Sequence, residues 1–207
     1  MDLYEAIYTR RDVRRFRSDP VPDDVLARML DAAHHAGSVG FMQPWNFILI
    51  RQRETREQVR AMFDEATRAA AESYSGARRQ LYDSLKLEGI LESALNLCVT
   101  CDRSRGGQVL GRNTIFDTDV YSTCCAVQNL WLAARAEGVG VGWVSILEPE
   151  RLCRLLALPE AVLPVAYLCV GYPQEFDEQP MLERVGWRER LRLDELVFYE
   201  RWGGKKT

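Results

Sequence analysis

The stretch DVYSTCCAVQNLWLAARAEGVGVGWVSI, residues 119–146, decides the fold of this chain. Residues 119–137 are apolar on nearly every face of a helix, which predicts a helix in the centre of the fold or in a subunit interface. Gly138 ends this helix, and the VGVGWVSI that follows predicts a glycine-rich strand. Its glycines do not lie between a first strand and a helix, so the spacing argues against a Rossmann dinucleotide site.

Helical and strand patterns alternate on both sides of this stretch. Apolar residues recur at helical spacing over residues 23–36, and a narrower apolar stripe runs through residues 55–74. Short apolar runs predict buried strands at NFILIRQ, LNLCVTCD and LPVAYLCVGYP. The alternation predicts an α+β or three-layer α/β architecture. Because no repeat or linker interrupts the pattern, residues 1–207 are expected to form a single domain.

Composition narrows the classes of partner. The chain has 207 residues, of which 47% are hydrophobic and 28% charged, as in ordinary soluble globular proteins. Its net charge of −3 gives no overall field that favours nucleic acid. No apolar run approaches the roughly 20 residues that span a bilayer, and the N-terminus lacks the apolar core of a signal peptide. We therefore expect a cytoplasmic protein without nucleic-acid or membrane partners.

The cysteines and histidines do not predict a metal or redox site. The run CVTC has the spacing of a redox motif, but its context predicts a strand, whereas that motif normally opens a helix. His34 and His35 are adjacent and point in different directions on a helix, so a shared metal is not expected. Cysteine in an apolar run is usually a small buried hydrophobe. Five cysteines lie in such runs, namely Cys98, Cys124, Cys125, Cys153 and Cys169.

Four arginines surround one aspartate in TRRDVRRF, residues 9–16. Guanidinium groups bind anions through paired, charge-assisted hydrogen bonds, and the absence of a basic overall charge favours one small anion over a polyanion. The cluster could also be a basic helix end that stabilises the helix dipole. Asp12 could be a structural carboxylate paired to Arg11 or Arg15, and the neighbouring guanidiniums are expected to keep it ionised.

Two further segments have open interpretations. Residues 75–94, SGARRQLYDSLKLEGILESA, fit an amphipathic surface helix, but residues 75–90 could also form a mobile lid over a site. The tail, residues 186–207, is basic and then partly apolar. It resembles an arm more than a core element.

Several segments in the same order resemble the FMN-dependent nitroreductase superfamily. They are RRDVRRF, SVGFMQPWNF, the long helix that leads into GVGVGW, and WRERL near the C-terminus. The resemblance implies an α+β, three-layer sandwich with a mainly antiparallel sheet flanked by helices. It also implies a homodimer with FMN at the interface and one strand exchanged from the partner's C-terminal arm.

Within that superfamily the chain most resembles the 5,6-dimethylbenzimidazole synthases. The segments RRDVR, GSVGFMQPWNF, SLKLEGI, LCVTCDR and WVSI carry this resemblance. It implies that reduced FMN is the substrate, that O2 is the co-substrate, and that no metal takes part. The products would be 5,6-dimethylbenzimidazole, the lower ligand of vitamin B12, and erythrose 4-phosphate. A separate flavin reductase would supply the reduced FMN.

The resemblance also implies roles for individual residues. Asp12 would shuttle protons at the ribityl chain, and Ser145 would hydrogen-bond the flavin or its oxygen adduct. Lys86 would lie near the pyrimidine edge of the ring, and Gln43 would frame the ring or the dimer interface. The remaining flavin contacts are expected from Arg10, Arg11, Arg14, Val144, Arg188 and Arg190.

Two rival functions remain open on the sequence. An NAD(P)H-dependent nitro- or quinone reductase would share the flavin site but needs an open face above the ring. A non-catalytic flavin-binding or chaperone-partnering protein would need a partner-binding motif, and the sequence has none that we recognise.

Overall fold

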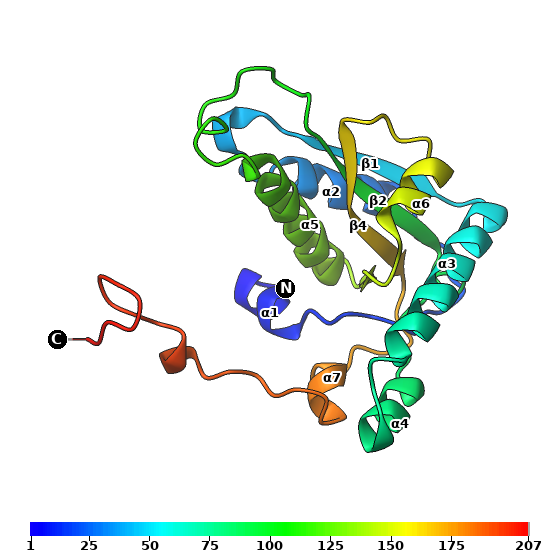
Figure 1. Cartoon of the computed structure of the whole chain (residues 1–207). Coiled ribbons are helices and arrows are strands. Elements are labelled where there is room, and N and C mark those ends of the chain that lie inside the picture. The colour runs from blue at the N-terminus through cyan, green and yellow to red at the C-terminus, as the bar shows by residue number, and fades with distance from the viewer. Residues whose placement is uncertain (207) are drawn as a thin grey trace. The chain divides into compact units, whose positions relative to one another are not determined.

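A four-stranded sheet lies at the centre of residues 1–176 in the computed structural model, which describes residues 1–206 (Figure 1). The strand order is β1-β2-β4-β3, and every neighbouring pair is antiparallel. The antiparallel sheet confirms that the glycine-rich strand is no part of a doubly wound dinucleotide fold. The strands are β1 (Trp45–Ile50), β2 (Leu95–Asp102), β3 (Gly140–Val144) and β4 (Val162–Gly171).

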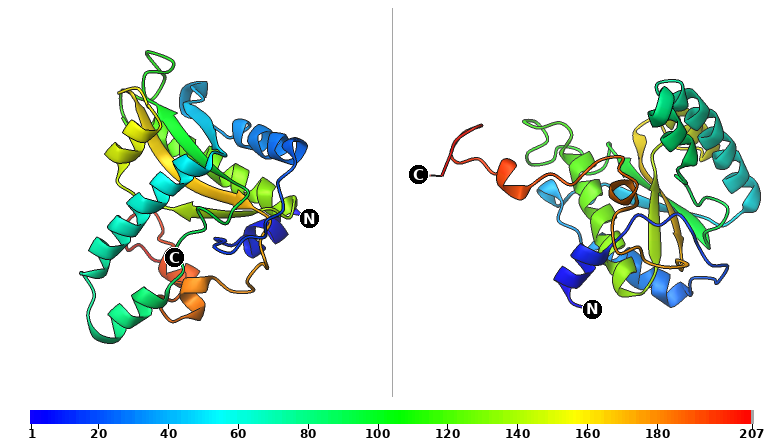
Figure 2. Two further views of the ribbon diagram at one scale, coloured as in Figure 1. Left: turned by 90° about the vertical axis from the view of Figure 1, so that its right-hand side faces the viewer. Right: turned by 90° about the horizontal axis from the view of Figure 1, so that it is seen from below.

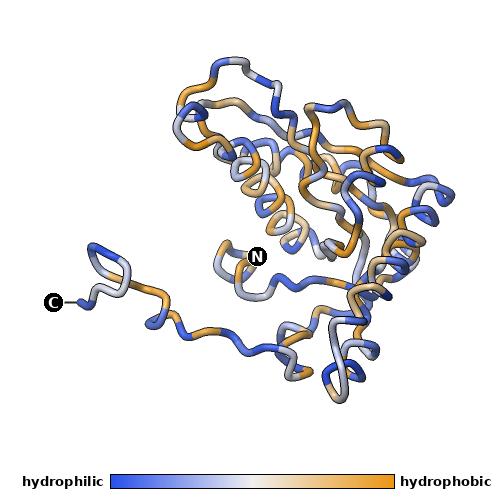
Figure 3. Tube along the Cα trace, viewed as in Figure 1, coloured by the Kyte–Doolittle hydropathy of each residue, from blue (hydrophilic) through white to orange (hydrophobic). Residues whose placement is uncertain are grey.

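Helices cover both faces of this sheet, which confirms the three-layer α+β architecture. On one face lie α2 (Asp23–His34) and α5 (Thr118–Ala136), which pack on each other and on the strands. On the other face lie α3 (Arg53–Ala71) and α6 (Pro149–Leu155) (Figure 2). In Figure 3, polar and apolar residues alternate along α3, as expected for a helix with one face on the core.

Alternation along β2 divides the core into two clusters. Leu95, Leu97 and Val99 belong to the cluster under α2 and α5, whereas Cys98 belongs to the cluster on the α3 and α6 side. Successive side chains of a strand point to opposite faces, so a strand that is covered on both faces has a mostly apolar sequence. The prediction of a buried strand at LNLCVTCD is therefore confirmed.

Helix α5 begins and ends one residue earlier than the predicted 119–137. Its inner side is buried against the sheet, but its outer side includes Tyr121, which is 57% exposed, and an exposed Cys125. The prediction that Cys125 is a buried hydrophobe is wrong in this chain, because the residue lies on the outer side of the helix. Cys98 is buried, and burial raises the pKa of its thiol to about 12, which disfavours the reactive thiolate.

The remaining elements are short. Helix α1 (Leu3–Thr9) packs against α5, and η1 (Val39–Phe41) precedes β1. Helix α4 (Gly76–Ser84) occupies less than half of the amphipathic segment predicted at 75–94. In the described chain, no helix is long and apolar enough to cross a membrane.

The chain divides into two units, Met1–Phe176 and a smaller one that begins at Asp177. The smaller unit contains α7 (Met181–Arg184) and η2 (Leu193–Glu195), and most of its residues are exposed. Large apolar side chains are exposed throughout its second half, including Leu193, Phe198 and Trp202. A strand exchanged from this arm stays a prediction.

Candidate functional site

The arginine-rich segment after α1 lies along the free edge of β3. The Val13 N–H donates to the Val141 carbonyl at 3.0 Å, and Asp12 and Val141 form a parallel bridge. The segment thus extends the sheet beyond β3, and its side chains are fixed relative to the end of that strand.

Two glycines of the GVGVG run make room for this added segment. A Cβ at Gly142 would lie 2.1 Å from the Val13 carbonyl oxygen, and one at Gly140 would lie 2.9 Å from a Val13 methyl carbon. No larger residue fits at Gly142 without moving the backbone. A third glycine, Gly89, fits against the ring of Phe16 in the same way, at 2.5 Å.

The four arginines have four different environments. Arg11 donates to the Tyr8 carbonyl at 2.9 Å and to the Arg10 carbonyl at 2.8 Å, so it caps the C-terminal end of α1. Arg11 therefore fits the alternative in which an arginine of this cluster stabilises the end of a helix. The Cζ of Arg10 lies 4.5 Å from the centroid of the Trp131 ring, and Arg15 is exposed.

Arg14 is the arginine that contacts Asp12. It donates to the Trp143 carbonyl at 2.8 Å and forms an ion pair with the Asp12 carboxylate. The other Asp12 oxygen accepts the Trp143 N–H at 2.8 Å. The predicted pairing of Asp12 with Arg11 or Arg15 is therefore wrong, because Arg11 is turned towards α1.

Burial raises the pKa of Asp12, and this effect exceeds the lowering by Arg14, the Trp143 N–H and Arg10. We expected the guanidiniums to dominate, and the direction is the opposite. The side chain is still 42% exposed, so water reduces the desolvation of the carboxylate. A raised pKa brings a carboxyl group closer to the range in which it exchanges protons at neutral pH.

Arg14 also has unused hydrogen-bonding capacity. Its side chain is 13% exposed, and Nε and Nη1 are buried with no hydrogen-bond partner among residues 1–206. Buried donors of a charged group are costly when they have no acceptor. An anionic ligand would supply such acceptors, so this guanidinium fits an anion-binding role.

A cavity of about 240 Å³ opens at the end of β3. Ser145 is exposed and lines it, together with apolar residues of α6 and β4 such as Leu152 and Ala166. Val144 also lines the cavity, but its side chain is 2% exposed and belongs to the core cluster on the α6 side. The geometry provides a mostly apolar recess that the exposed Ser145 helps to line.

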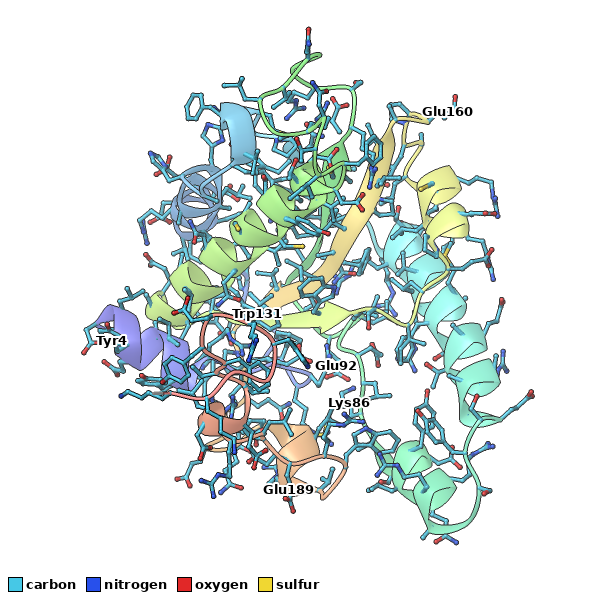
Figure 4. The ribbon with its side chains drawn as sticks, turned by 60° about the vertical axis from the view of Figure 1, so that its left-hand side comes forward. Tyr4, Lys86, Glu92, Trp131, Glu160 and Glu189 are labelled. Atoms are coloured by element: carbon cyan, nitrogen blue, oxygen red, sulfur yellow. The ribbon has the colours of Figure 1, made fainter. Side chains whose placement is uncertain are left out.

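Lys86 lies in the segment between α4 and β2. Its Nζ is 2.6 Å from a Glu92 oxygen and 3.7 Å from a Glu88 oxygen (Figure 4). Glu88 is buried, accepts the Ile90 N–H at 2.7 Å and pairs with Arg60 at 2.7 Å. Residues 88–90 of the predicted lid are therefore anchored in the core.

The same anchor brings Gly89 close to the arginine segment. A Cβ at Gly89, three residues after Lys86, would lie 3.1 Å from the Arg14 carbonyl oxygen. Arg56 fixes the next turn, because its guanidinium donates to the carbonyls of Ile90 and Ser93. The sequence analysis did not predict the anchoring roles of Arg56 and Arg60. Nothing in the sequence distinguishes these two residues from the other charged residues of the polar helix α3.

Gln43 is not brought to these residues within one chain. It precedes β1, whereas Ser145 follows β3, and these two edge strands are separated by three strand spacings, or about 14 Å across the sheet. Its carbonyl accepts from Arg105 at 2.8 Å, and its N–H donates to the Ser38 hydroxyl at 3.2 Å. A second cavity, of about 810 Å³, is lined by Gln43, Arg105 and neighbouring residues.

Arg188 and Arg190 belong to the smaller unit and are exposed there. Their return to the phosphate stays a prediction. The sequence analysis did not place Trp131 or Trp143 at the site, but both contact the arginine segment. The Trp131 indole N–H donates to the Arg11 carbonyl, and the Trp143 carbonyl accepts from Arg14. Among residues 1–206, no cluster of three histidine, cysteine or acidic side chains could hold a metal ion.

Comparisons with known proteins give a consistent result. Residues 7–172 match the model of the nitroreductase family. The chain is 43% identical to the 5,6-dimethylbenzimidazole synthase of Rhodospirillum rubrum, over 91% of this chain and 90% of the relative. It is 42% identical to the enzyme of the same name from Rhodobacter capsulatus, over 91% of this chain and 92% of the relative.

The fold is also similar to solved structures. One is a crystal structure of iodotyrosine deiodinase bound to FMN and 3-iodo-L-tyrosine, with a TM-score of 0.74. The match covers 97% of this chain and 99% of that chain at 21% identity.

Proposed function

The chain belongs to the nitroreductase family, and from that premise we propose that it is a 5,6-dimethylbenzimidazole synthase. It would convert reduced FMN and O2 into 5,6-dimethylbenzimidazole and erythrose 4-phosphate. The observation that carries the proposal is the carboxylate of Asp12 beside Arg14 in the anion-binding segment. A flavin reductase needs the arginines but has no use for a proton acceptor at the ribityl chain. Identities of 42–43% to two synthases support the same assignment.

The residues fit the phosphate of FMN. Arg14 has buried donors without an acceptor in the described chain, and the Arg10 guanidinium is held on an indole ring. We propose that Arg10 and Arg14 bind the phosphate together with Arg188 and Arg190, and that Arg11 acts through the end of α1. Guanidinium forks suit a phosphate dianion because they donate two parallel hydrogen bonds.

The remaining contacts would follow the end of β3. Asp12 would face the ribityl hydroxyls, and the ring would enter the cavity at Val144 and Ser145, where the Ser145 hydroxyl can donate or accept. Lys86 would place a cation near the pyrimidine edge, where it favours a reduced, negatively charged ring.

We propose a homodimer in which Gln43 comes from the second copy. Gln43 and Ser145 lie at opposite edges of one sheet, so both can contact one flavin when two chains contribute. The exposed outer side of α5, with Tyr121 and Cys125, supplies an apolar surface for such an interface.

The flavin would supply its own reaction with O2, and the protein would bind, shield and move protons. Asp12 would accept and return a proton at a ribityl carbon or hydroxyl, held in place by the Trp143 N–H. Residues 76–87 would cover the site as a lid, with the anchored residues 88–90 as its fixed end. A separate flavin reductase would deliver the reduced FMN.

The test is a single turnover. The purified protein is mixed without oxygen with excess chemically reduced FMN, air is admitted, and 5,6-dimethylbenzimidazole is sought by chromatography. We expect the product with FMN and none with heat-denatured protein. Oxidised FMN without any benzimidazole would contradict the proposal.

The same preparation separates the rival function. In stopped-flow experiments with NADPH, a nitro- or quinone reductase would reduce its bound flavin rapidly. We expect slow or no reduction, because the synthase would receive a flavin that is already reduced.

A further inference from the structure

Trp131 lies on the inner side of α5, in the last two turns of the helix, and touches the arginine segment in two ways (Figure 4). Its indole N–H donates to the Arg11 carbonyl at 3.2 Å. The face of its ring lies 4.5 Å from the Cζ of Arg10. One side chain thus holds both the backbone and a guanidinium of the proposed phosphate site.

A second residue one turn later supports the same backbone. Arg135 donates through Nε to the Thr9 hydroxyl at 3.0 Å and to the Thr9 carbonyl at 3.3 Å. The segment is therefore held by α5 on one side and by β3 on the other, where Val13 bonds to Val141. The ring of Trp131 therefore meets the Arg10 side chain on a backbone that is held on both sides.

Stacking on an indole restricts that side chain. A free arginine samples many rotamers, and each ordered rotamer lowers the affinity of a ligand that requires it. Trp131 is 8% exposed and packed in the core cluster, so its ring is a fixed surface. Tryptophan is also the aromatic residue that attracts a cation most strongly.

We propose that Trp131 is a positioning residue that orders Arg10 for phosphate recognition, an inference that rests on the proposed FMN function. The indole ring sets the plane of the guanidinium, whereas the backbone of the segment keeps its bonds to Val141 and Arg135 when the ring is removed. Trp131 itself does not touch the substrate.

The experiment compares FMN with riboflavin, which has the same ring and ribityl chain but no phosphate. Dissociation constants are measured by flavin fluorescence for the wild type, Trp131→Leu, Arg10→Ala and the double variant. Loss of the stacked cation should weaken FMN binding by about 3- to 30-fold and leave riboflavin binding unchanged. In the Arg10→Ala background, Trp131→Leu should add no further loss. Leu130→Val, on the same helix and fully buried, is the matched control for a core lesion and should leave the FMN-to-riboflavin ratio unchanged.

The outcomes separate this inference from the proposed function. Equal weakening of FMN and riboflavin by Trp131→Leu, or additive losses in the double variant, would make Trp131 merely structural. A loss in Arg10→Ala without one in Trp131→Leu would overturn the positioning role and leave the phosphate site intact. An unchanged ratio in Arg10→Ala would remove Arg10 from the phosphate site, and the inference with it. If Trp131→Leu does not fold, Trp131→Met has an unbranched side chain that adapts to an irregular space, lacks the ring and gives the same comparison.

Discussion

The substitution Asp12→Asn tests the proposed chemistry because the structure separates the two hydrogen bonds of the carboxylate. One oxygen accepts the Trp143 N–H at 2.8 Å, and the Asn carbonyl can keep that bond. The other oxygen forms the ion pair with Arg14, which an amide NH2 group cannot replace. The variant therefore keeps the shape of the site and removes the charge and the basicity.

Two effects of opposite sign follow. Asp12 would share the Arg14 guanidinium with a bound phosphate and repel it, but the carboxylate is 42% exposed, so its removal should strengthen phosphate binding by only about 1 kcal/mol. FMN affinity should rise about fivefold, since about 1.4 kcal/mol is tenfold. Loss of a general acid–base group should lower benzimidazole formation by about 10²–10⁴. The variant should bind FMN more tightly and convert less of it.

The assay is the ratio of 5,6-dimethylbenzimidazole to reoxidised FMN after one exposure to oxygen, with FMN affinity measured in parallel. Arg15→Gln, an exposed neighbour, is the control and should match the wild type in both readouts. Because burial raises the pKa of Asp12 above its usual value, product formation in the wild type should be lost as the pH falls through that raised value. A wild-type product ratio in Asp12→Asn would make the aspartate structural and refute the reasoning.

Three further predictions concern the anion segment and the assembly. Arg14→Ala should lower FMN affinity about 10- to 100-fold and leave riboflavin unaffected, which titration of both flavins will check. Gly142→Ala places a Cβ 2.1 Å from the Val13 carbonyl oxygen and should cost about 1–3 kcal/mol of unfolding free energy, whereas Gly37→Ala, with nothing within 4 Å, should be neutral in thermal melts. The protein should sediment as a dimer of about 47 kDa, and Cys125→Arg, which places like charges in a two-fold interface, should release monomers.

The fold could be predicted from the sequence where burial leaves a continuous pattern. All of the apolar runs that predicted strands are strands, because both faces of the sheet are covered and few polar residues interrupt them. The segment at 75–94 was harder because its polar and apolar residues fit a helix throughout. The helix ends at Ser84, and the chain then continues to Glu88, which turns into the core and pairs with Arg60.

The types of residue at the candidate site could be predicted from the sequence, but the contacts between these residues could not. Arg14 bonds to a carbonyl 129 residues away, and the Trp131 indole bonds to a carbonyl 120 residues away. Such partners depend on how β3 and α5 meet the segment, which no local pattern encodes. We used the glycines of GVGVG only as an argument against a Rossmann site. The structure shows a further reason for glycine at position 142, because the Val13 carbonyl occupies the space that a side chain would need.

An aspartate is compatible with four neighbouring arginines because the arginines have different contacts. Arg11 binds the end of α1, Arg10 stacks on an indole, Arg15 is exposed, and Arg14 forms the ion pair with Asp12. A phosphate bound at Nε and Nη1 of Arg14, which have no partner among residues 1–206, would share this guanidinium with the Asp12 carboxylate, and repulsion between the two anions would link the two contacts thermodynamically. We therefore expect a ligand with a phosphate at the end of a polyol chain to weaken the ion pair of Asp12 as it anchors, which would leave the carboxylate beside that chain.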